Sequence, residues 1–156
     1  MAADPYTYAL TLLARRELSA AQIRSRLKKR EFPDSDIDAA IGRLQTSRAL
    51  DDGRVARAYA RTAASAKGRG RARILREIEA LGIDRSTARD AVAEAFAEVD
   101  EDVLLAKALD RKLRGRQVQN AGEFRRLHQF LMRQGFEPGK IVRALEARGG
   151  RAFGDQ

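Results

Sequence analysis

The sequence contains no cysteine, no tryptophan, a single histidine and only three prolines among its 156 residues. Without cysteine, the chain cannot form a disulfide or supply thiolates to a zinc site or a covalent mechanism. The lone His128 excludes chemistry that needs two imidazoles. No hydrophobic run approaches the roughly 20 residues of a membrane span, and residues 1–6 lack a signal-peptide pattern. We therefore expect a soluble, cytoplasmic, non-enzymatic protein with no cofactor and no membrane partner.

Acidic and large apolar residues are also scarce. The chain has 22 Asp and Glu against 31 Lys and Arg, a net charge of +9, and 25 of the basic residues are Arg. Alanine supplies 28 positions, so the 44% apolar content holds few bulky side chains. A net positive charge of this size favours a negatively charged partner.

The residues that are abundant favour helices. Ala, Leu, Glu, Arg and Lys dominate, and apolar residues recur three and four positions apart, which is typical of amphipathic helices. No period-2 alternation long enough for a sheet is present. Helix N-caps are predicted where short polar side chains precede helical segments, at Ser19, Asp34, the pair Asp51 and Asp52, and Asp84.

The apolar pattern repeats three times. Phe32, Ile83 and Phe136 each follow a short stop, and they lie 51 and 53 residues apart. Positions nine and five before each anchor, and five and nine after it, are apolar in every copy. The further members of these registers are Ile23, Leu27, Ile37, Ile41, Ile74, Ile78, Ala88, Val92, Leu127, Leu131, Ile141 and Leu145. Each copy therefore indicates a helix, a tight turn and a second helix.

A third apolar segment precedes each pair, so each copy is a three-helix repeat of about fifty residues. The predicted fold is all-α, with repeats at 6–49, 50–99 and 100–148 and a mobile tail at 149–156. Repeats of this size stack on their neighbours to bury apolar surface. We expect an elongated, curved, solenoid-like array in a monomeric protein.

The same residues resemble the RecX family, the regulatory proteins of the RecA recombinase, over nearly the whole chain. In the first repeat, the match is carried by Arg15-Arg16-Glu17-Leu18-Ser19 and Phe32. In the second, Leu50-Asp51-Asp52 is followed by Gly70, Arg73-Ile74 and Gly82-Ile83, the most specific part of the match. In the third, it is Phe130-Leu131-Met132-Arg133-Gln134-Gly135-Phe136. Val55 departs from the pattern, because the family usually has Phe there.

The resemblance implies an all-helical protein without a catalytic centre that binds in the groove of RecA filaments on single-stranded DNA. Family members limit filament growth, strand exchange, ATP hydrolysis and co-protease activity. The implied partners are thus the RecA filament and single-stranded or double-stranded DNA. The residues themselves indicate only a basic helical array, and they leave open a direct DNA-binding protein whose helix pairs act as helix-turn-helix modules.

The segment from Arg54 to Arg76 is the strongest candidate contact surface. It holds eight basic residues and no acidic residue in 23 positions. They are Arg54, Arg57, Arg61, Lys67, Arg69, Arg71, Arg73 and Arg76. Guanidinium groups bind phosphates in a bidentate fork, and we expect Arg69, Arg73 and Arg76 to share one face of the helix after Gly70. The bound anion could be DNA or an acidic face of RecA, and the sequence does not separate these.

A second basic cluster follows in the last repeat. Lys107, Arg111, Lys112, Arg114 and Arg116 lie close together, with Arg125 and Arg126 beyond a loop. We rank this cluster second as a partner surface. A third group, Arg24 to Arg30, ends a predicted helix, where cations interact favourably with the helix dipole, so it needs no functional explanation.

Overall fold

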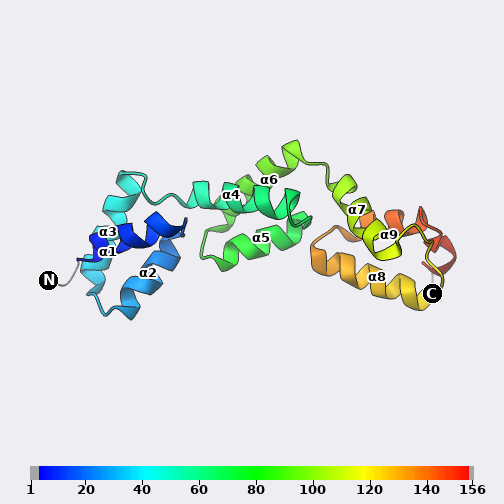
Figure 1. Cartoon of the computed structure of the whole chain (residues 1–156), viewed down its shortest axis with the longest axis horizontal. Coiled ribbons are helices and arrows are strands. Elements are labelled where there is room, and N and C mark those ends of the chain that lie inside the picture. Colours follow the sequence, from blue (N-terminus) through cyan, green and yellow to red (C-terminus); the bar gives the residue numbers. More distant parts are fainter. Residues whose placement is uncertain (1–3, 155–156) are drawn as a thin grey trace. The chain divides into compact units, whose positions relative to one another are not determined.

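The computed structural model describes residues 4–154, and this part of the chain is entirely helical, with no strand (Figure 1). The α-helices are α1 (Pro5–Arg15), α2 (Ala20–Lys29), α3 (Asp34–Thr46), α4 (Asp52–Ser65), α5 (Arg71–Ala80), α6 (Arg85–Glu98), α7 (Glu101–Leu113), α8 (Ala121–Gln134) and α9 (Pro138–Glu146). A short 3₁₀ helix, η1 (Gly150–Phe153), follows. The all-α prediction is confirmed. Within residues 4–154, no helix is both long and apolar enough to cross a bilayer.

The chain divides into two compact units. Unit 1 comprises residues up to Tyr59 together with Glu77–Ala91, and unit 2 comprises Ala60–Arg76 together with residues from Val92 onward. The division falls within α4, α5 and α6, so it does not coincide with the predicted repeat limits. The three repeats and their curved array stay predictions.

The repeated apolar register forms the core. Of the positions that define it, Phe32 is half-buried and all the others are buried. In unit 1, α1 and α2 both pack on α3, around a cluster that includes Ile23, Leu27, Ile37 and Ile41. In unit 2, α7, α8 and α9 pack on one another, and Leu131 and Ile141 are completely buried. The periodicity therefore identified the inward faces of these helices.

Three of the predicted N-caps are confirmed. Ser19 and Gln22 form a reciprocal capping box at the start of α2. Asp51 accepts the N–H of Arg54 at 3.1 Å, and Asp84 accepts that of Thr87 at 2.9 Å. These backbone hydrogen bonds stabilise the charged carboxylates and lower the pKa of both. The prediction for Asp34 is wrong, because Pro33 occupies the cap position and Asp34 is the first helical residue.

Within unit 1, the start of α2 docks on the turn that ends α5. We call this contact the first joint. The Ser19 hydroxyl donates to the carbonyl of Leu81, and a Cβ placed on Gly82 would lie 2.3 Å from the Cβ of Ala21. Gly82 also has a φ of +83°, a conformation that other residues adopt only with strain. Glycine is therefore required here by both backbone conformation and close approach.

Within unit 2, the start of α5 docks in the same way on the turn that ends α8. In this second joint, the N–H of Gly70 donates to the carbonyl of Gln134 at 2.8 Å, and that of Ala72 to Gly135 at 3.1 Å. A Cβ on Gly135, whose φ is +96°, would lie 2.4 Å from the nitrogen of Arg73. The residues of the second joint follow those of the first by 51 to 53 positions, the spacing of the repeated register.

In each joint, the docked segment also contacts an acidic residue that begins a third helix. Asp52, the first residue of α4, accepts the N–H of Ala20 at 2.8 Å in the first joint. Glu101, the first residue of α7, accepts from Arg71 Nε at 3.0 Å in the second, with Lys140 Nζ 3.6 Å away. The Glu101 side chain is 6% exposed, and these two cations compensate its buried charge.

The turn after α2 differs from the two joint turns. Its residue with positive φ is Glu31, at +63°, which precedes Phe32 just as Gly82 and Gly135 precede the other anchors. Glu31 carries a Cβ and is exposed. This turn therefore lacks the glycine that both joints require.

Arg54 links three segments of unit 1. Its guanidinium binds both carboxylate oxygens of Glu17, at 3.1 and 3.3 Å, and donates to the carbonyls of Arg48 and Ala49 at 3.0 and 3.2 Å. The side chain thus connects the link between α1 and α2 to the end of α3. Its hydrogen-bonding capacity is used within the fold.

The end of the described chain forms η1, which packs against α8 and α9. Gly150 is buried, and the N–H of Val118 donates to the carbonyl of Arg148 just before it. The last two residues of the predicted mobile tail lie outside the described residues. Mobility of this segment stays a prediction.

The joints predict that even alanine, in place of their turn glycines, lowers the free energy of unfolding. A Cβ at positive φ costs about 1–2 kcal/mol, and overlap with the docked helix adds to it. We therefore expect Gly82→Ala and Gly135→Ala each to lower the free energy of unfolding by about 2–4 kcal/mol, measured by urea denaturation followed by circular dichroism. Gly115→Ala is the matched control, because its φ is +80° and nothing lies within 4 Å of its Cβ position. Equal losses at all three sites would contradict the role of the joints.

Arg54 allows a second test of the fold. Arg54→Ala removes four hydrogen bonds, two of them to a carboxylate, so we expect a loss of about 1–3 kcal/mol in the free energy of unfolding. Arg61→Ala, an exposed position on the same helix, should change stability by less than about 0.5 kcal/mol. An unchanged denaturation midpoint for Arg54→Ala would show that the contacts of Arg54 do not hold unit 1 together.

Candidate functional site

The predicted segment from Arg54 to Arg76 does not form one continuous charged surface. Its exposed members are Arg57, Arg61, Lys67, Arg71 and Arg76, whereas Arg54, Arg69 and Arg73 are half-buried. Arg54 belongs to unit 1 through the contacts described above. Arg71 binds Glu101, and its guanidinium carbon lies 4.8 Å from the centre of the Phe96 ring. Part of this charge therefore serves folding.

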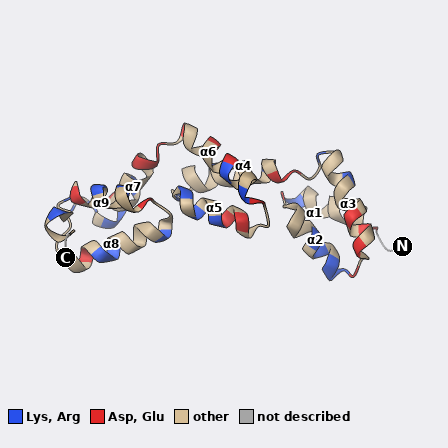
Figure 2. Ribbon diagram, turned by 180° about the vertical axis from the view of Figure 1, so that it is seen from behind, with Lys and Arg blue, Asp and Glu red and all other residues tan. Residues whose placement is uncertain are grey.

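The prediction that three arginines share one helical face is wrong for Arg69. This residue precedes α5, and its N–H donates to the carbonyl of Ala63 at 3.0 Å. Arg73 and Arg76 do lie on α5, where basic positions precede the acidic Glu77 and Glu79 (Figure 2). The helix α5 begins at Arg71 and does not extend N-terminally to Arg69, because Gly70 is held by its hydrogen bond in the second joint.

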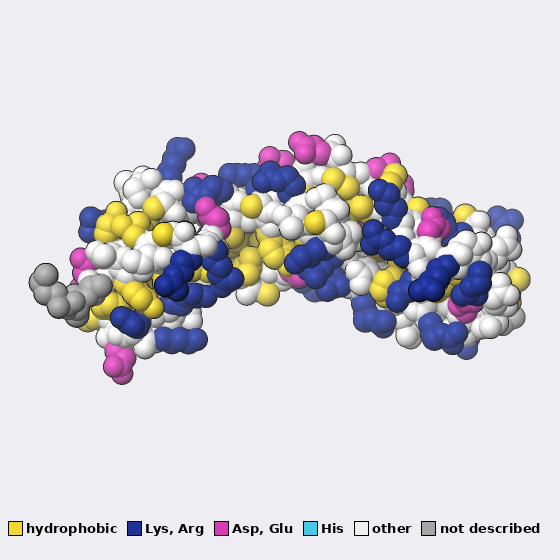
Figure 3. All heavy atoms as spheres, viewed as in Figure 1, with side chains coloured by type: hydrophobic (Ala, Val, Ile, Leu, Met, Phe, Trp, Pro, Cys, Tyr) yellow, Lys and Arg dark blue, Asp and Glu magenta, His cyan; other side chains and the backbone are white. Residues whose placement is uncertain are grey.

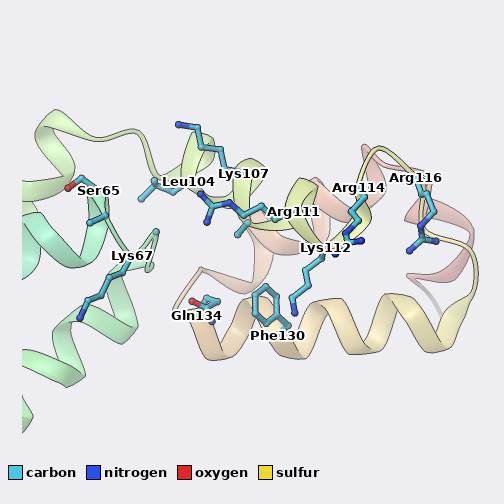
Figure 4. Close-up of a pocket in the computed structure, with 13 residues that line it drawn as sticks. Ser65, Lys67, Leu104, Lys107, Arg111, Lys112, Arg114, Arg116, Phe130 and Gln134 are labelled. Carbon is cyan, nitrogen blue, oxygen red and sulfur yellow. The ribbon is translucent and has the colours of Figure 1, made fainter.

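A basic groove in unit 2 brings one residue of the first cluster together with the second cluster. The groove has a volume of about 750 Å³. It is bounded by the end of α4, by α7 with the residues that follow it, and by α8 (Figure 4). Its basic lining residues are Lys67, Lys107, Arg111, Lys112, Arg114 and Arg116, and none of its thirteen lining residues is acidic. We call this feature the basic groove.

One aromatic side chain lies among these cations. Lys112 reaches from α7 toward Phe130 on α8, with its Nζ 4.4 Å from the ring centre (Figure 4). Lys107 and Arg111 lie about one turn apart on α7, and Arg114 directly follows the helix as its C-cap. Ser65 and Gln134 add neutral hydrogen-bonding groups to the lining. The groove thus combines a row of positive charge with an aromatic ring and polar groups.

The nearby acidic side chains are engaged in ion pairs. Asp110 accepts from Arg148 Nε at 2.7 Å, and this hydrogen bond lowers the pKa of its carboxyl group. Glu123 pairs with Arg116 at 3.2 Å and accepts the N–H of Gln119. Neither acid lines the groove. Among the groove cations, Arg116 is partly neutralised by its ion pair with Glu123.

The remaining candidates lie elsewhere. Arg57, Arg61 and Arg76, together with Arg125 and Arg126 on α8, are exposed and do not line the basic groove. On the face shown in Figure 3, Lys and Arg side chains gather over α7 and α8, the elements that carry the second cluster. The cluster ranked second from sequence thus supplies five of the six basic residues that line the groove.

No metal site is evident in residues 4–154, where no three His, Asp or Glu side chains form a group that could hold an ion. His128 is half-buried and stacks on Phe124, with ring centres 6.4 Å apart. Both aromatic rings therefore take part in packing.

Among the polar and aromatic residues that line the groove, sequence reasoning missed Ser65, Phe130 and Gln134. Phe130 and Gln134 belong to the segment that carries the family resemblance, and no functional role was assigned to them. Phe130 follows Glu123 by seven residues and Gln134 directly precedes Gly135, so both lie on α8. Only the packing of α8 on α7 brings them to the basic residues.

Comparison with protein families identifies the chain. Residues 6–44 match the first three-helix domain of RecX, and residues 51–92 match its second three-helix domain. Together these ranges cover more than half of the chain.

Curated relatives extend the match. The chain is 34% identical over 147 residues to "Regulatory protein RecX" of Geobacillus kaustophilus, covering 93% of this chain but only 54% of that protein. It is 32% identical over 140 residues to "Regulatory protein RecX" of Pseudomonas entomophila, covering 90% of this chain and 88% of that protein. The chain thus spans about half of the first relative and most of the second.

Solved structures support the same fold. RecX from Lactobacillus salivarius superposes with a TM-score of 0.76 at 21% identity, over 93% of this chain and 94% of that one. A second structure of regulatory protein RecX superposes with a TM-score of 0.78 at 22% identity, over 92% of this chain and 70% of that one. From the family domains and the sequence relatives together, the chain belongs to the RecX family of regulatory proteins.

Proposed function

We propose that this protein regulates the RecA recombinase by docking on RecA filaments assembled on single-stranded DNA, with the basic groove as a contact surface. By this binding it limits filament growth, strand exchange, ATP hydrolysis and co-protease activity. The role is non-catalytic and belongs to the cytoplasm. The observation that carries the proposal is a groove with six basic residues and no acidic residue in a member of the RecX family.

The charge of the groove suits a polyanionic partner. Lysine and arginine that neutralise phosphates release counterions, which gives binding that weakens steeply with salt. Arginine also binds phosphate or carboxylate groups in a bidentate fork. A RecA filament on single-stranded DNA offers both kinds of anion, so the groove can take part in docking through either.

The alternative, a direct DNA reader built from helix-turn-helix pairs, is less well supported. In such a motif, the second helix of the pair enters the major groove with its first residues against the bases. Here α3 begins with the exposed acids Asp34, Asp36 and Asp38. On α6, the exposed acids Asp90, Glu94 and Glu98 lie beyond the first turn, which begins with Arg85. The acidic start of α3 repels phosphates, which favours docking through the basic groove over reading by α3.

The central test measures ATP hydrolysis by RecA on single-stranded DNA at physiological salt, with and without this protein. We expect substoichiometric amounts of the protein to reduce the rate, because a regulator bound to a filament affects many RecA subunits. Omission of DNA is the control for direct effects on RecA. Undiminished hydrolysis under conditions where the protein binds bare DNA tightly would favour the alternative function.

Charge reversal tests the role of the groove. We expect the double variant Arg111→Glu, Lys112→Glu to require about ten- to a hundredfold more protein for half-maximal inhibition, since it replaces two attractive contacts with repulsive ones. The matched control is Lys28→Glu, Lys29→Glu, an equal change of charge at two adjacent exposed positions outside the groove, in the group that needs no functional explanation. Equal effects of the two pairs would assign binding to net charge and not to the groove. Circular dichroism verifies that both variants are folded.

A further inference from the structure

We infer that the basic groove binds a single strand of nucleic acid directly, with one base stacked on Phe130 and the flanking phosphates held by the basic residues of α7. This inference rests on the proposed function and assigns a ligand to the same site. It distinguishes single-stranded DNA from an acidic protein surface, the two partners that the charge of the groove permits.

The composition of the groove favours a nucleic acid over an acidic protein. Proteins that bind single strands combine a positively charged groove with aromatic side chains on which bases stack. The groove has both elements, since Phe130 lies among six cations. An acidic protein surface would use the cations but has no need of the half-buried Phe130 ring that lines the groove with them.

The arrangement on α7 suits a linear polyanion. Lys107 and Arg111 lie about one turn apart on α7, and Arg114 is the residue that caps its C-terminus. All three line the groove, and together they form the row of cations on its α7 side. Phe130 projects from α8, opposite this row (Figure 4). A strand that follows the row presents its phosphates to α7 and its bases to α8.

Lys112 would change partner when the strand binds. Its Nζ now lies 4.4 Å from the centre of the Phe130 ring, and its flexible stem lets the ammonium move to a neighbouring phosphate. That movement exposes the face of the ring to a base. A cation–π contact at an exposed site is weaker than base stacking on an aromatic ring, so the exchange favours the bound state.

A duplex fits this mode poorly. Paired bases are stacked on their neighbours, so their faces are not available to a ring at the side of a groove. Stacking on Phe130 therefore requires an unpaired base, which is the form of DNA on which the proposed partner filament assembles.

The absence of tryptophan from the chain allows a direct test. Phe130→Trp introduces a single tryptophan at the stacking position, which can be excited selectively over the three tyrosines. A nucleobase stacked on the indole quenches its fluorescence. We expect quenching by an oligothymidine of about ten nucleotides, a length within the range that single-strand sites cover. An abasic oligonucleotide of equal length should bind more weakly and leave the fluorescence unchanged, because it has phosphates but no bases. Quenching by the abasic strand, or none by oligothymidine that is bound, would overturn the inference.

Affinity measurements on the wild type and on variants without the introduced tryptophan complement the fluorescence. We expect Phe130→Leu to weaken binding of labelled oligothymidine about 5- to 100-fold, the loss of one stacked base, with an unchanged salt dependence. Lys112→Ala should reduce the slope of log K against log salt by about 0.7, the loss of one phosphate contact. Met132→Leu, exposed on the same helix outside the groove, should change neither quantity. Equal affinities of wild type and Phe130→Leu would contradict the stacking role.

Other polyanions separate this inference from the proposed function. Poly-glutamate that competes with oligothymidine equally well would assign the groove to acidic protein surfaces. Inhibition of RecA that persists in Phe130→Leu, without detectable oligonucleotide binding, would overturn the inference and leave the regulatory function intact. Quenching by oligothymidine in a protein that does not affect RecA would refute the regulatory function and leave the single-strand site intact.

Discussion

The fold depends on the close approach of a helix N-terminus to a glycine turn. In both joints, residues at the start of one helix approach the turn that ends another so closely that the turn glycine has no room for a Cβ. The N-terminal N–H groups of a helix have no partners within that helix, and the second joint supplies carbonyl partners for two N–H groups at the start of α5. In the first joint, the Ser19 side chain and the carboxylate of Asp52 make corresponding contacts. The joints thus satisfy polar backbone groups at the same places where they bring helices together.

The same arrangement explains how a basic chain distributes its few acidic residues. Asp51, Asp84 and Asp100 cap helices, and Asp52 and Glu101 complete the joints. Asp110 and Glu123, which lie on the two helices that form the groove, pair with Arg148 and Arg116. Because these carboxylates are engaged in local contacts, the lining of the groove is left to Lys, Arg and neutral side chains. Charge separation is therefore a result of folding, and the net charge of +9 alone does not locate it.

Much of the fold could be predicted from sequence because helical periodicity is local. Residues three and four positions apart lie on the same face of a helix, so the spacing of apolar residues was enough to identify the inward positions from Ile23 to Leu145. Caps at Ser19 and Asp84 followed from residue type, whereas Asp34 failed because Pro33 before it already had the extended backbone of a cap. The resemblance to the RecX family was confirmed, and it named Gly70, Gly82 and Gly135 without giving their role. The reason for these glycines emerged only from the contacts of the two joints.

The site could be predicted only in part, because it depends on which helices meet. Lys67 and the cluster from Lys107 to Lys112 were proposed as separate surfaces, and the packing of unit 2 unites them. Arg54 and Arg71 belong to the acid-free segment but bind Glu17 and Glu101, acids that lie 37 and 30 residues away in the chain. The sequence reveals where charge is concentrated, but it does not reveal which charged side chains form ion pairs with residues far away in the chain. Phe130 was missed for the same reason, since its cationic neighbours come from another helix.

The turn at Glu31 has a consequence for assembly. A contact that joins the start of one element to the end of the next is head-to-tail, and contacts of this kind can continue from one molecule to another and produce open fibres. Glu31 occupies the position of the joint glycines and carries a Cβ where they have none, so the first turn cannot receive the helix start of a second copy in the manner of Gly82 or Gly135. The side chain at this position therefore removes from the first turn the close approach on which both joints depend.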